Sequence, residues 1–160
     1  MSEIYCKYNG DVYHAEIEDN KIELTSDVFV DGFVPYIDVL GKKHFDMFMK
    51  VVGKNEIDIL FEQKILVKFK DIYFEPFAGK IIDNVLEEKR ILLFTASEDI
   101  AQQFGFTKKE QFVFAKNIEI DEIDEIKVVK KPIAMFKNKP IIEEIINKSD
   151  IRKWLTVHII

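Results

Sequence analysis

The alternation of apolar and polar side chains at the start of the chain is the feature that most constrains its fold. Ile4, Cys6 and Tyr8 share one side of an extended strand, because successive side chains of a strand point to opposite faces. Asn9-Gly10 follows directly and is the strongest two-residue signal for a tight hairpin turn. A second turn at Asp19-Asn20 leads into another alternating stretch. The first 30 residues therefore predict an antiparallel β-meander.

Further along the chain, the spacing of apolar residues predicts short helices. In the first of them, large apolar residues recur at positions i, i+3, i+4 and i+7, which share one helical face. The second has Ser97 as an N-cap and Gly105 as its end. Two more are expected after Pro140 and after Ser149, each with a stripe of apolar residues. The first two predicted helices cover 42–52 (with Phe45, Phe48, Met49 and Val52 on one face) and 98–104.

Most of the remaining chain has the composition of strands. Residues 56–95 carry successive runs of Ile, Leu, Val and Phe, whereas 80–88, 107–126 and 150–160 are compatible with either helix or strand. Strands come in runs instead of alternating with helices, which is typical of the α+β class. We therefore predict a predominantly antiparallel sheet with an N-terminal β-meander and three or four short helices packed on it. A length of 160 residues fits a single domain, 1–160.

The composition indicates an ordinary globular protein, with 48% apolar and 32% charged residues. No apolar run approaches the roughly 20 residues that a membrane span needs. Glu3 stands where an export signal carries positive charge, and the single cysteine, Cys6, has no partner for an internal disulfide. We expect a cytoplasmic protein without a membrane partner.

The net charge of −6 is concentrated near the N-terminus, where residues 1–40 hold nine carboxylates and two lysines. Arg90 and Arg152 are the only arginines, although arginine is the side chain most used to read DNA bases. Phosphate tracking needs a basic face, and no strongly basic segment is evident. The sequence therefore argues against direct binding of nucleic acid.

Candidate catalytic residues are few, and none forms a recognised motif. Cys6 and His14 lie on the two predicted strands around Asn9-Gly10, where paired residues have numbers that sum to about 19. Cys6 should then pair with Tyr13, which places His14 on the opposite face and separates the thiol from the imidazole. We predict a packed thiol at Cys6 and no catalytic residues, so the protein is not expected to be an enzyme.

Metal and cofactor sites are not indicated either. The three histidines are scattered, and no CxxC, HExxH or calcium-loop spacing occurs. Residues 119–125 hold five carboxylates, but they lack the glycine turn that gathers calcium ligands, and their isoleucines tie the segment to the core. No run of glycines precedes a helix, as a phosphate cradle would require. We expect no metal and no cofactor.

Clustered carboxylates are the remaining signal that points to a function. A rigid acidic surface can steer and hold a basic partner, or take the place of nucleic-acid phosphates at the mouth of a nuclease. The hypothesis is a non-enzymatic protein that occludes a basic protein partner, most concretely an immunity-type inhibitor of a bacterial toxin. The expected partner-binding residues are carboxylates with two aromatic anchors: Glu16, Glu18, Glu23, Glu119, Asp121, Glu122, Asp124, Tyr13 and Tyr36.

Two other classes of function stay open. One is a small-molecule-binding domain or minor enzyme with an aromatic-lined pocket under 72–79 or beside 98–104. The other is an assembly module whose exposed strand pairs with a second copy or a partner. A toxin gene with a basic C-terminal domain immediately upstream would favour the inhibitor, whereas a stable dimer would favour the assembly module.

Overall fold

The computed structural model describes residues 3–76 and 85–158. Within these ranges twelve strands form hydrogen-bonded sheet, and the pairings are mostly antiparallel. The residues pack into two compact units. The N-terminal unit comprises Glu3–Gln63 and Lys130–Ile141, and the C-terminal unit comprises the described parts of Lys64–Val129 and Ile142–Ile160.

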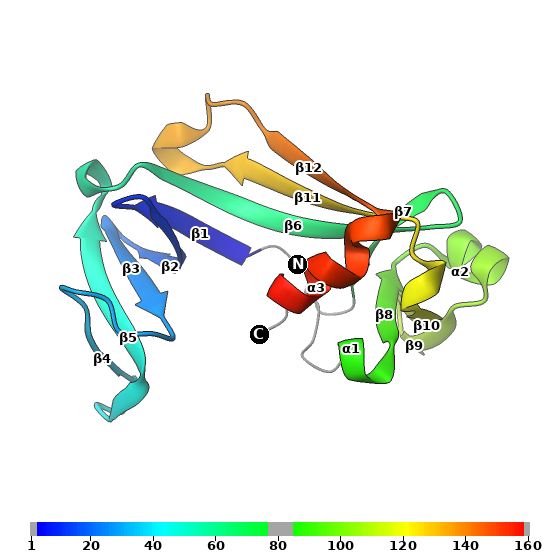
Figure 1. Ribbon diagram of the computed structural model, residues 1–160, viewed down its shortest axis with the longest axis horizontal. Helices are drawn as coiled ribbons and strands as arrows, with labels where there is room; N and C mark the ends of the chain where they lie inside the picture. Colours follow the sequence, from blue (N-terminus) through cyan, green and yellow to red (C-terminus); the bar gives the residue numbers. More distant parts are fainter. Residues whose placement is uncertain (1–2, 77–84, 159–160) are drawn as a thin grey trace. The chain divides into compact units, whose positions relative to one another are not determined.

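The N-terminal unit contains the predicted meander (Figure 1). Its strands follow the order β4-β5-β3-β2-β1-β6, with antiparallel pairing throughout. Asn9 and Gly10 have φ values of 51° and 87°, which fit the tight turn that joins the first two strands. The strands are β1 (Glu3–Tyr8), β2 (Asp11–Glu18), β3 (Lys21–Ser26), β4 (Val34–Ile37), β5 (Lys43–Gly53) and the first part of β6 (Ile59–Phe69), with short 3-10 helices η1 (Lys54–Glu56) and η4 (Ala134–Phe136).

The core of the N-terminal unit lies on one face of these strands. Leu24 and Cys6 are fully buried, and Ile22 and Val52 are almost so. Phe33 closes this cluster, and Phe48 packs against it from β5. Because side chains alternate along a strand, the neighbouring residues of β2 and β3 point away from this core.

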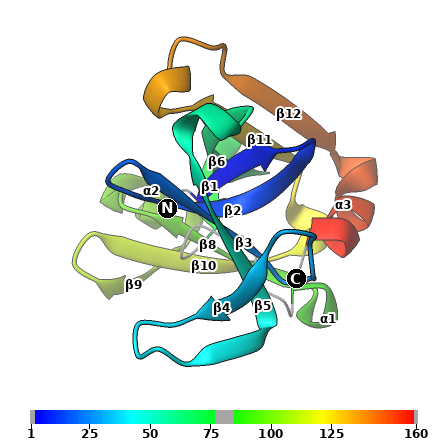
Figure 2. The same cartoon turned by 90° about the vertical axis from the view of Figure 1, so that its left-hand side faces the viewer.

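The β4–β5 hairpin extends beyond the strand next to it. The pairing of β3 with β5 ends at Ser26 and Phe48, whereas the pairing of β4 with β5 continues to Ile37 and Lys43. Figure 2 shows the cyan hairpin running past β3 to its turn. Among the described strands, none pairs with the turn residues as a third neighbour.

The C-terminal unit continues the sheet in the order β6-β7-β8-β10-β9, and β11 pairs with β6 and β12. Its core is built on fully buried Leu93, Ile123, Ile126 and Leu155. Beyond β6 it contains β7 (Ile72–Pro76), β8 (Arg90–Thr95), β9 (Thr107–Glu110), β10 (Val113–Glu119), β11 (Glu125–Pro132) and β12 (Ile142–Asn147), with helices α1 (Val85–Glu88), α2 (Glu98–Phe104) and α3 (Ile151–His158) and 3-10 helices η3 (Ile120–Glu122) and η5 (Lys148–Asp150).

Two of the four predicted helices are wrong. Residues 42–52 form β5, and Gly53 has a φ of −87° and precedes η1 instead of capping a helix. The segment after Pro140 forms β12, which pairs with β11. In both segments the hydrogen bonds of neighbouring strands override a helix-like spacing of apolar residues. The prediction of a largely antiparallel sheet is confirmed, whereas two of the predicted helices are present instead of three or four.

The other two predicted helices are present. In α2, the Ser97 hydroxyl accepts a hydrogen bond from the backbone N–H of Ile100, and Gly105 ends the helix with a φ of 76°. The last helix, α3, begins at Ile151 after η5. Residues 107–110 and 113–119 are strands, within a segment that the sequence left open between helix and strand. Most of the ambiguous segment 80–88 and part of the expected aromatic pocket at 72–79 lie outside the described residues.

The single domain, 1–160, stays a prediction. The boundaries between the two units fall at residues 63/64, inside β6, and 129/130, inside β11. One cooperative unfolding transition, the same by every spectroscopic probe, is the expected signature. Among the described residues, no helix has the length and apolar character needed to cross a membrane.

Two serines test how helix caps contribute to stability. Ser97→Ala removes the hydroxyl that caps α2, so we expect the free energy of unfolding to fall by about 1 kcal/mol. Ser149→Ala is the matched control, because the N-cap of η5 is Asn147 and makes no side-chain hydrogen bond. Urea denaturation of both variants measures the difference. Equal losses would contradict the assignment of the cap.

Candidate functional site

The acidic residues of the β2–β3 hairpin lie together on one face of the sheet. Glu16 is directly opposite Glu23 in the strand register, and Glu18 is opposite Lys21. Residues opposite each other on one face of an antiparallel pair have Cβ atoms about 5 Å apart. Ile17 and Ile22 pair in the same ladder and point to the other face, so burial of the core turns the carboxylates outward.

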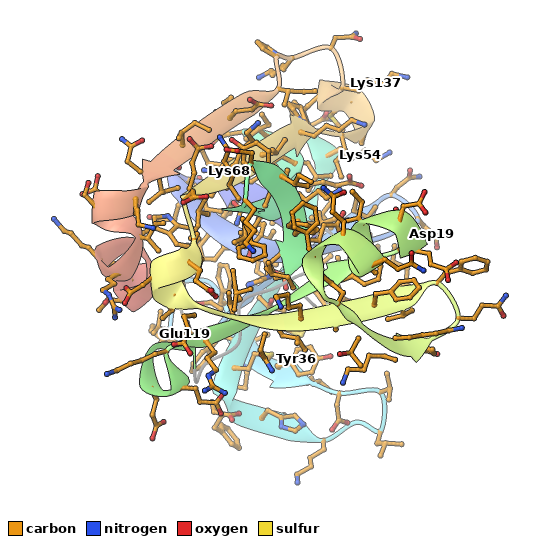
Figure 3. The ribbon with its side chains drawn as sticks, turned by 90° about the vertical axis from the view of Figure 1, so that its right-hand side faces the viewer. Asp19, Tyr36, Lys54, Lys68, Glu119 and Lys137 are labelled. Carbon is orange, nitrogen blue, oxygen red and sulfur yellow. The ribbon has the colours of Figure 1, made fainter. Side chains whose placement is uncertain are left out.

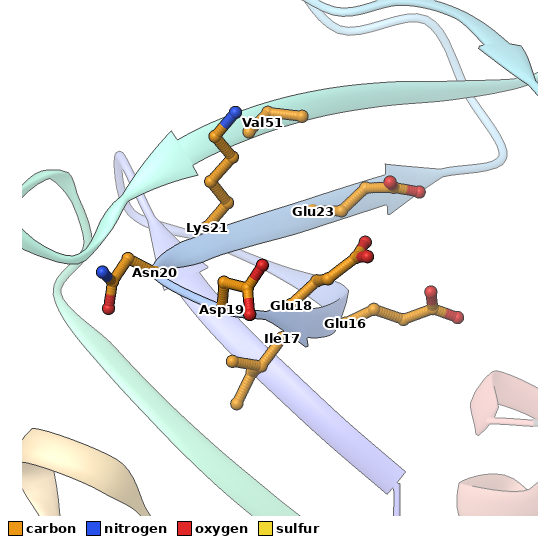
Figure 4. Close-up of a pocket in the computed structure, with 8 residues that line it drawn as sticks. All are labelled: Glu16, Ile17, Glu18, Asp19, Asn20, Lys21, Glu23 and Val51. Carbon is orange, nitrogen blue, oxygen red and sulfur yellow. The ribbon is translucent and has the colours of Figure 1, made fainter.

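These carboxylates line an open hollow of about 720 Å³. In Figure 4 the carboxylates of Glu16, Glu18 and Glu23 reach out on one side, while Ile17 points the other way. Lys21 runs instead toward Val51 of β5, whose side chain is half exposed. The full lining is Glu16, Ile17, Glu18, Asp19, Asn20, Lys21, Glu23 and Val51. We call Glu16, Glu18 and Glu23 the acidic hairpin surface.

The acidic hairpin surface carries uncompensated negative charge. Within the part of the chain that the structure describes, no Lys, Arg or His nitrogen lies within 4 Å of these three carboxylates. Partial burial, reinforced by the charges of Glu16 and Glu18, raises the pKa of Glu23. The fold therefore holds three like charges close together, and Lys21, opposite Glu18 in the same hollow, makes no ion pair with them.

The two tyrosines expected as anchors do not lie with these carboxylates. Tyr13 is an odd-numbered residue of β2, opposite Cys6, and its ring packs 5.1 Å from the ring of Phe33. It therefore belongs to the core side of the strand. Tyr36 lies on β4 (Figure 3), where its ring centroid is 6.0 Å from that of His44. Neither tyrosine lines the hollow.

The second group of predicted carboxylates belongs to the C-terminal unit and is compensated. Asp121 accepts a hydrogen bond from Arg152 at 2.7 Å, and this contact holds the pKa of Asp121 below its usual range. Glu119, at the end of β10 (Figure 3), lies 3.4 Å from Arg90. Asp124 lies 3.8 Å from Lys148.

Glu122, the fourth member of this group, accepts a hydrogen bond from the backbone N–H of Glu119 at 2.9 Å and so caps η3. Each of the four therefore has a partner within its own unit. These carboxylates organise the segment between β10 and β11, and they present much less free charge than the sequence alone indicates.

A protein-family model matches residues 1–135. The chain belongs to that family, described as uncharacterised conserved protein UCP033725. The match includes all of the predicted partner-binding residues and stops before β12 and α3. No curated protein and no solved structure matches the chain.

The Cys6–His14 pair does not form a catalytic dyad. Cys6 pairs with Tyr13, as the register around Asn9-Gly10 predicts, and its side chain is fully buried. His14 is exposed on the other face, where its ring lies 4.5 Å from that of Tyr5. Burial and the charge of Asp58 raise the pKa of the Cys6 thiol to about 11. A protonated, buried thiol is a poor nucleophile.

Among the residues that the structure describes, no three His, Cys, Asp or Glu side chains are placed to hold a metal ion. Sequence reasoning found the acidic hairpin surface but missed Val51, which forms its apolar rim. The reason is that 42–52 was predicted as a helix, which hides the strand pairing of Glu23 with Val51.

The strain in the acidic hairpin surface predicts a pH-dependent stability. Because the pKa of Glu23 is raised in the folded state, protonation stabilises the fold below the ordinary value of 4.5 and this contribution is lost as the pH rises. At pH 7 Glu23→Gln should therefore raise the free energy of unfolding by a few tenths of a kcal/mol. The gain should vanish near pH 4, as measured by chemical denaturation.

Glu110→Gln is the control for this experiment. Glu110 is also an exposed carboxylate in a strand, but lysines precede it in β9. Its replacement should not stabilise the protein at pH 7. A gain as large as that of Glu23→Gln, or one that is independent of pH, would contradict the proposed repulsion.

The environment of Cys6 predicts that the native thiol does not react. At pH 8 a thiol with a pKa of about 11 and no exposed surface should be labelled by iodoacetamide orders of magnitude more slowly than in guanidinium chloride. Mass spectrometry of timed samples measures both rates. Comparable rates in the folded and unfolded states would show that Cys6 is accessible.

Proposed function

We propose that this protein is a non-enzymatic binding protein that occludes a basic protein partner through its acidic hairpin surface. The most concrete form of this proposal is a cytoplasmic immunity-type inhibitor of a bacterial toxin, for example of a nuclease. The observation that carries the proposal is the set of three neighbouring carboxylates, none of which forms an ion pair within 4 Å in the described chain.

Electrostatic strain in the free protein supports this proposal. Like charges directly opposite each other on a sheet are destabilising, so a fold that retains Glu16 opposite Glu23 forgoes some stability. A lysine or arginine of a partner would relieve this repulsion and form charge-assisted hydrogen bonds. Partial burial is the main cause of the raised pKa of Glu23, and the charges of Glu16 and Glu18 add to it. Binding would therefore return the pKa of Glu23 toward its ordinary value.

The setting of the acidic hairpin surface supports recognition of a protein instead of a small cation. Val51 adds an exposed apolar side chain directly opposite Glu23, on the face that carries the carboxylates. A protein partner can bury such apolar rim residues while its cations meet the carboxylates. The carboxylates are also held on hydrogen-bonded strands, so little ordering is needed on binding.

The other predicted residues have smaller roles in this proposal. Glu119, Asp121, Glu122 and Asp124 are engaged within the C-terminal unit, so they would contribute long-range attraction and few direct contacts. Tyr13 would hold β2 on its core and would not touch the partner. Tyr36 stays a candidate anchor, because it lies on the edge strand β4.

Charge reversal tests the proposal directly. The triple variant Glu16→Lys, Glu18→Lys and Glu23→Lys should lose a partner that the wild-type protein captures from native lysate in low salt. The matched control reverses three exposed carboxylates of the C-terminal unit, Glu87→Lys, Glu110→Lys and Glu144→Lys, and so changes the net charge equally. Mass spectrometry of the captured proteins gives the readout.

The expected result is a basic protein retained by the wild-type chain and by the control but lost by the hairpin variant. Expression of this basic protein alone should stop bacterial growth, and coexpression of the present chain should restore growth. Equal capture by all three proteins would show that the acidic hairpin surface is a bystander. If the captured partner is not toxic, the binding function would stand, but the proposal of a toxin inhibitor would be wrong.

The small-molecule-binding domain or minor enzyme and the assembly module stay predictions. The hollow that the structure shows is open and lined by carboxylates, unlike the closed aromatic pocket that a small-molecule-binding domain would need. Part of the segment expected to form that pocket, 77–79, lies outside the described residues. In the described chain the edge strands are β4, β9 and β12, and an assembly module would pair through one of them.

A further inference from the structure

The turn of the β4–β5 hairpin exposes two large aliphatic side chains almost completely. Val39 is 99% exposed and Leu40 is 90% exposed, and Phe45 on β5 is 75% exposed. Isolated exposed apolar residues are common, but a cluster of fully exposed ones at a rigid projection marks an interaction site. The hairpin extends beyond β3 here, so no neighbouring strand of the unit covers these side chains.

The turn is rigid because Asp38 satisfies its backbone. Asp38 Oδ1 accepts hydrogen bonds from the backbone N–H groups of Leu40 and Lys42, both at 2.9 Å. The N–H of Gly41 donates to the carbonyl of Asp38, and the N–H of Asp38 donates to the carbonyl of Lys42. The remaining oxygen of Asp38 lies 2.8 Å from the Nε2 atom of His44. Four backbone N–H groups of the turn therefore have acceptors inside it.

Internal satisfaction of the backbone is the condition for entering an apolar phase. A polar backbone group that leaves water without a partner is costly, and lipid provides no partners. The negative charge of Asp38 is also engaged with His44. The turn thus presents apolar side chains at its tip while the N–H groups of Asp38, Leu40, Gly41 and Lys42 are already hydrogen-bonded.

The charges next to the tip complement an anionic surface. Lys42 and Lys43 are both exposed and follow the apolar pair after one intervening residue, Gly41. Apolar residues beside lysines are typical of segments that lie in the headgroup region of anionic membranes. The same strand separates this turn from the acidic hairpin surface, since Val51 and Lys43 are roughly 25 Å apart along β5.

We propose that the β4–β5 turn is a peripheral membrane contact, in which Val39 and Leu40 insert between anionic lipid headgroups and Lys42 and Lys43 bind those headgroups. This inference is independent of the proposed inhibitor function. It departs from the expectation of no membrane partner, which rested on the lack of a spanning segment. Two aliphatic side chains with two lysines give weak, reversible binding, comparable to that of a single acyl chain.

Vesicle cosedimentation of the full chain tests the proposal. The probes are sucrose-loaded vesicles of phosphatidylcholine alone and of phosphatidylcholine with a large share of phosphatidylserine, in low salt. Wild-type protein should sediment with the anionic vesicles only. Val39→Ser with Leu40→Ser should lower the partition coefficient at least about tenfold, and Lys42→Gln with Lys43→Gln should do the same.

Matched controls come from the C-terminal unit. Ile142→Ser with Val157→Ser removes two exposed aliphatic residues, and Lys108→Gln with Lys109→Gln removes two adjacent exposed lysines of β9. Both controls should bind anionic vesicles as the wild type does. Circular dichroism checks that the variants fold, which is expected because the turn lies outside both cores.

Three outcomes overturn the proposal. The first is wild-type protein that does not sediment with anionic vesicles. The second is unchanged binding by the Val39→Ser, Leu40→Ser variant. The third is loss of a captured protein, instead of lipid, in that variant, which would assign the turn to a protein interface. None of these outcomes depends on the acidic hairpin surface. The membrane contact and the inhibitor function can therefore be disproved independently of each other.

Discussion

Burial of Ile22 and Leu24 is the interaction on which the candidate site depends. Both side chains are inserted in the core of the N-terminal unit, and the pleat of β3 then forces Glu23 to the other face. Ile17 pairs with Ile22 in the neighbouring strand, which fixes the register and brings Glu16 opposite Glu23. A slip of one residue would place the glutamates in the core, where an unpaired charge is very costly. Apolar packing thus compensates the repulsion between the carboxylates.

The sequence was sufficient where local signals agree with tertiary contacts. The meander follows from strict alternation and from the turn at Asn9-Gly10, and the same logic separates Cys6 from His14. Helix α2 was also predictable, because Ser97 and Gly105 mark both of its ends. In each case a short-range rule needs no knowledge of which strands become neighbours. The acidic hairpin surface could be predicted from the sequence for this reason.

Errors arose where nonlocal pairing decides the structure. In β5, Phe45, Phe48, Met49 and Val52 fit a helical stripe, yet Phe48 packs on the core while Phe45 is largely exposed. An irregularity in the pairing of β4 with β5 disturbs the period of two, so the strand does not alternate cleanly. The compensation of Asp121 by Arg152, thirty-one residues away, was equally invisible. Charge counts along a sequence cannot show which carboxylates already have partners.

The two ends of β5 have opposite chemistry, and this polarity shapes what the N-terminal unit can do. At one end Val51 borders three unpaired carboxylates, and at the other Lys43 follows an apolar turn braced by Asp38. Their separation exceeds the Debye length of about 8 Å in physiological salt, so neither end senses the charge of the other strongly. Substitutions at such distances usually have additive effects. A single rigid sheet can therefore present an anionic and a cationic contact at once, each to a different kind of surface, without either weakening the other.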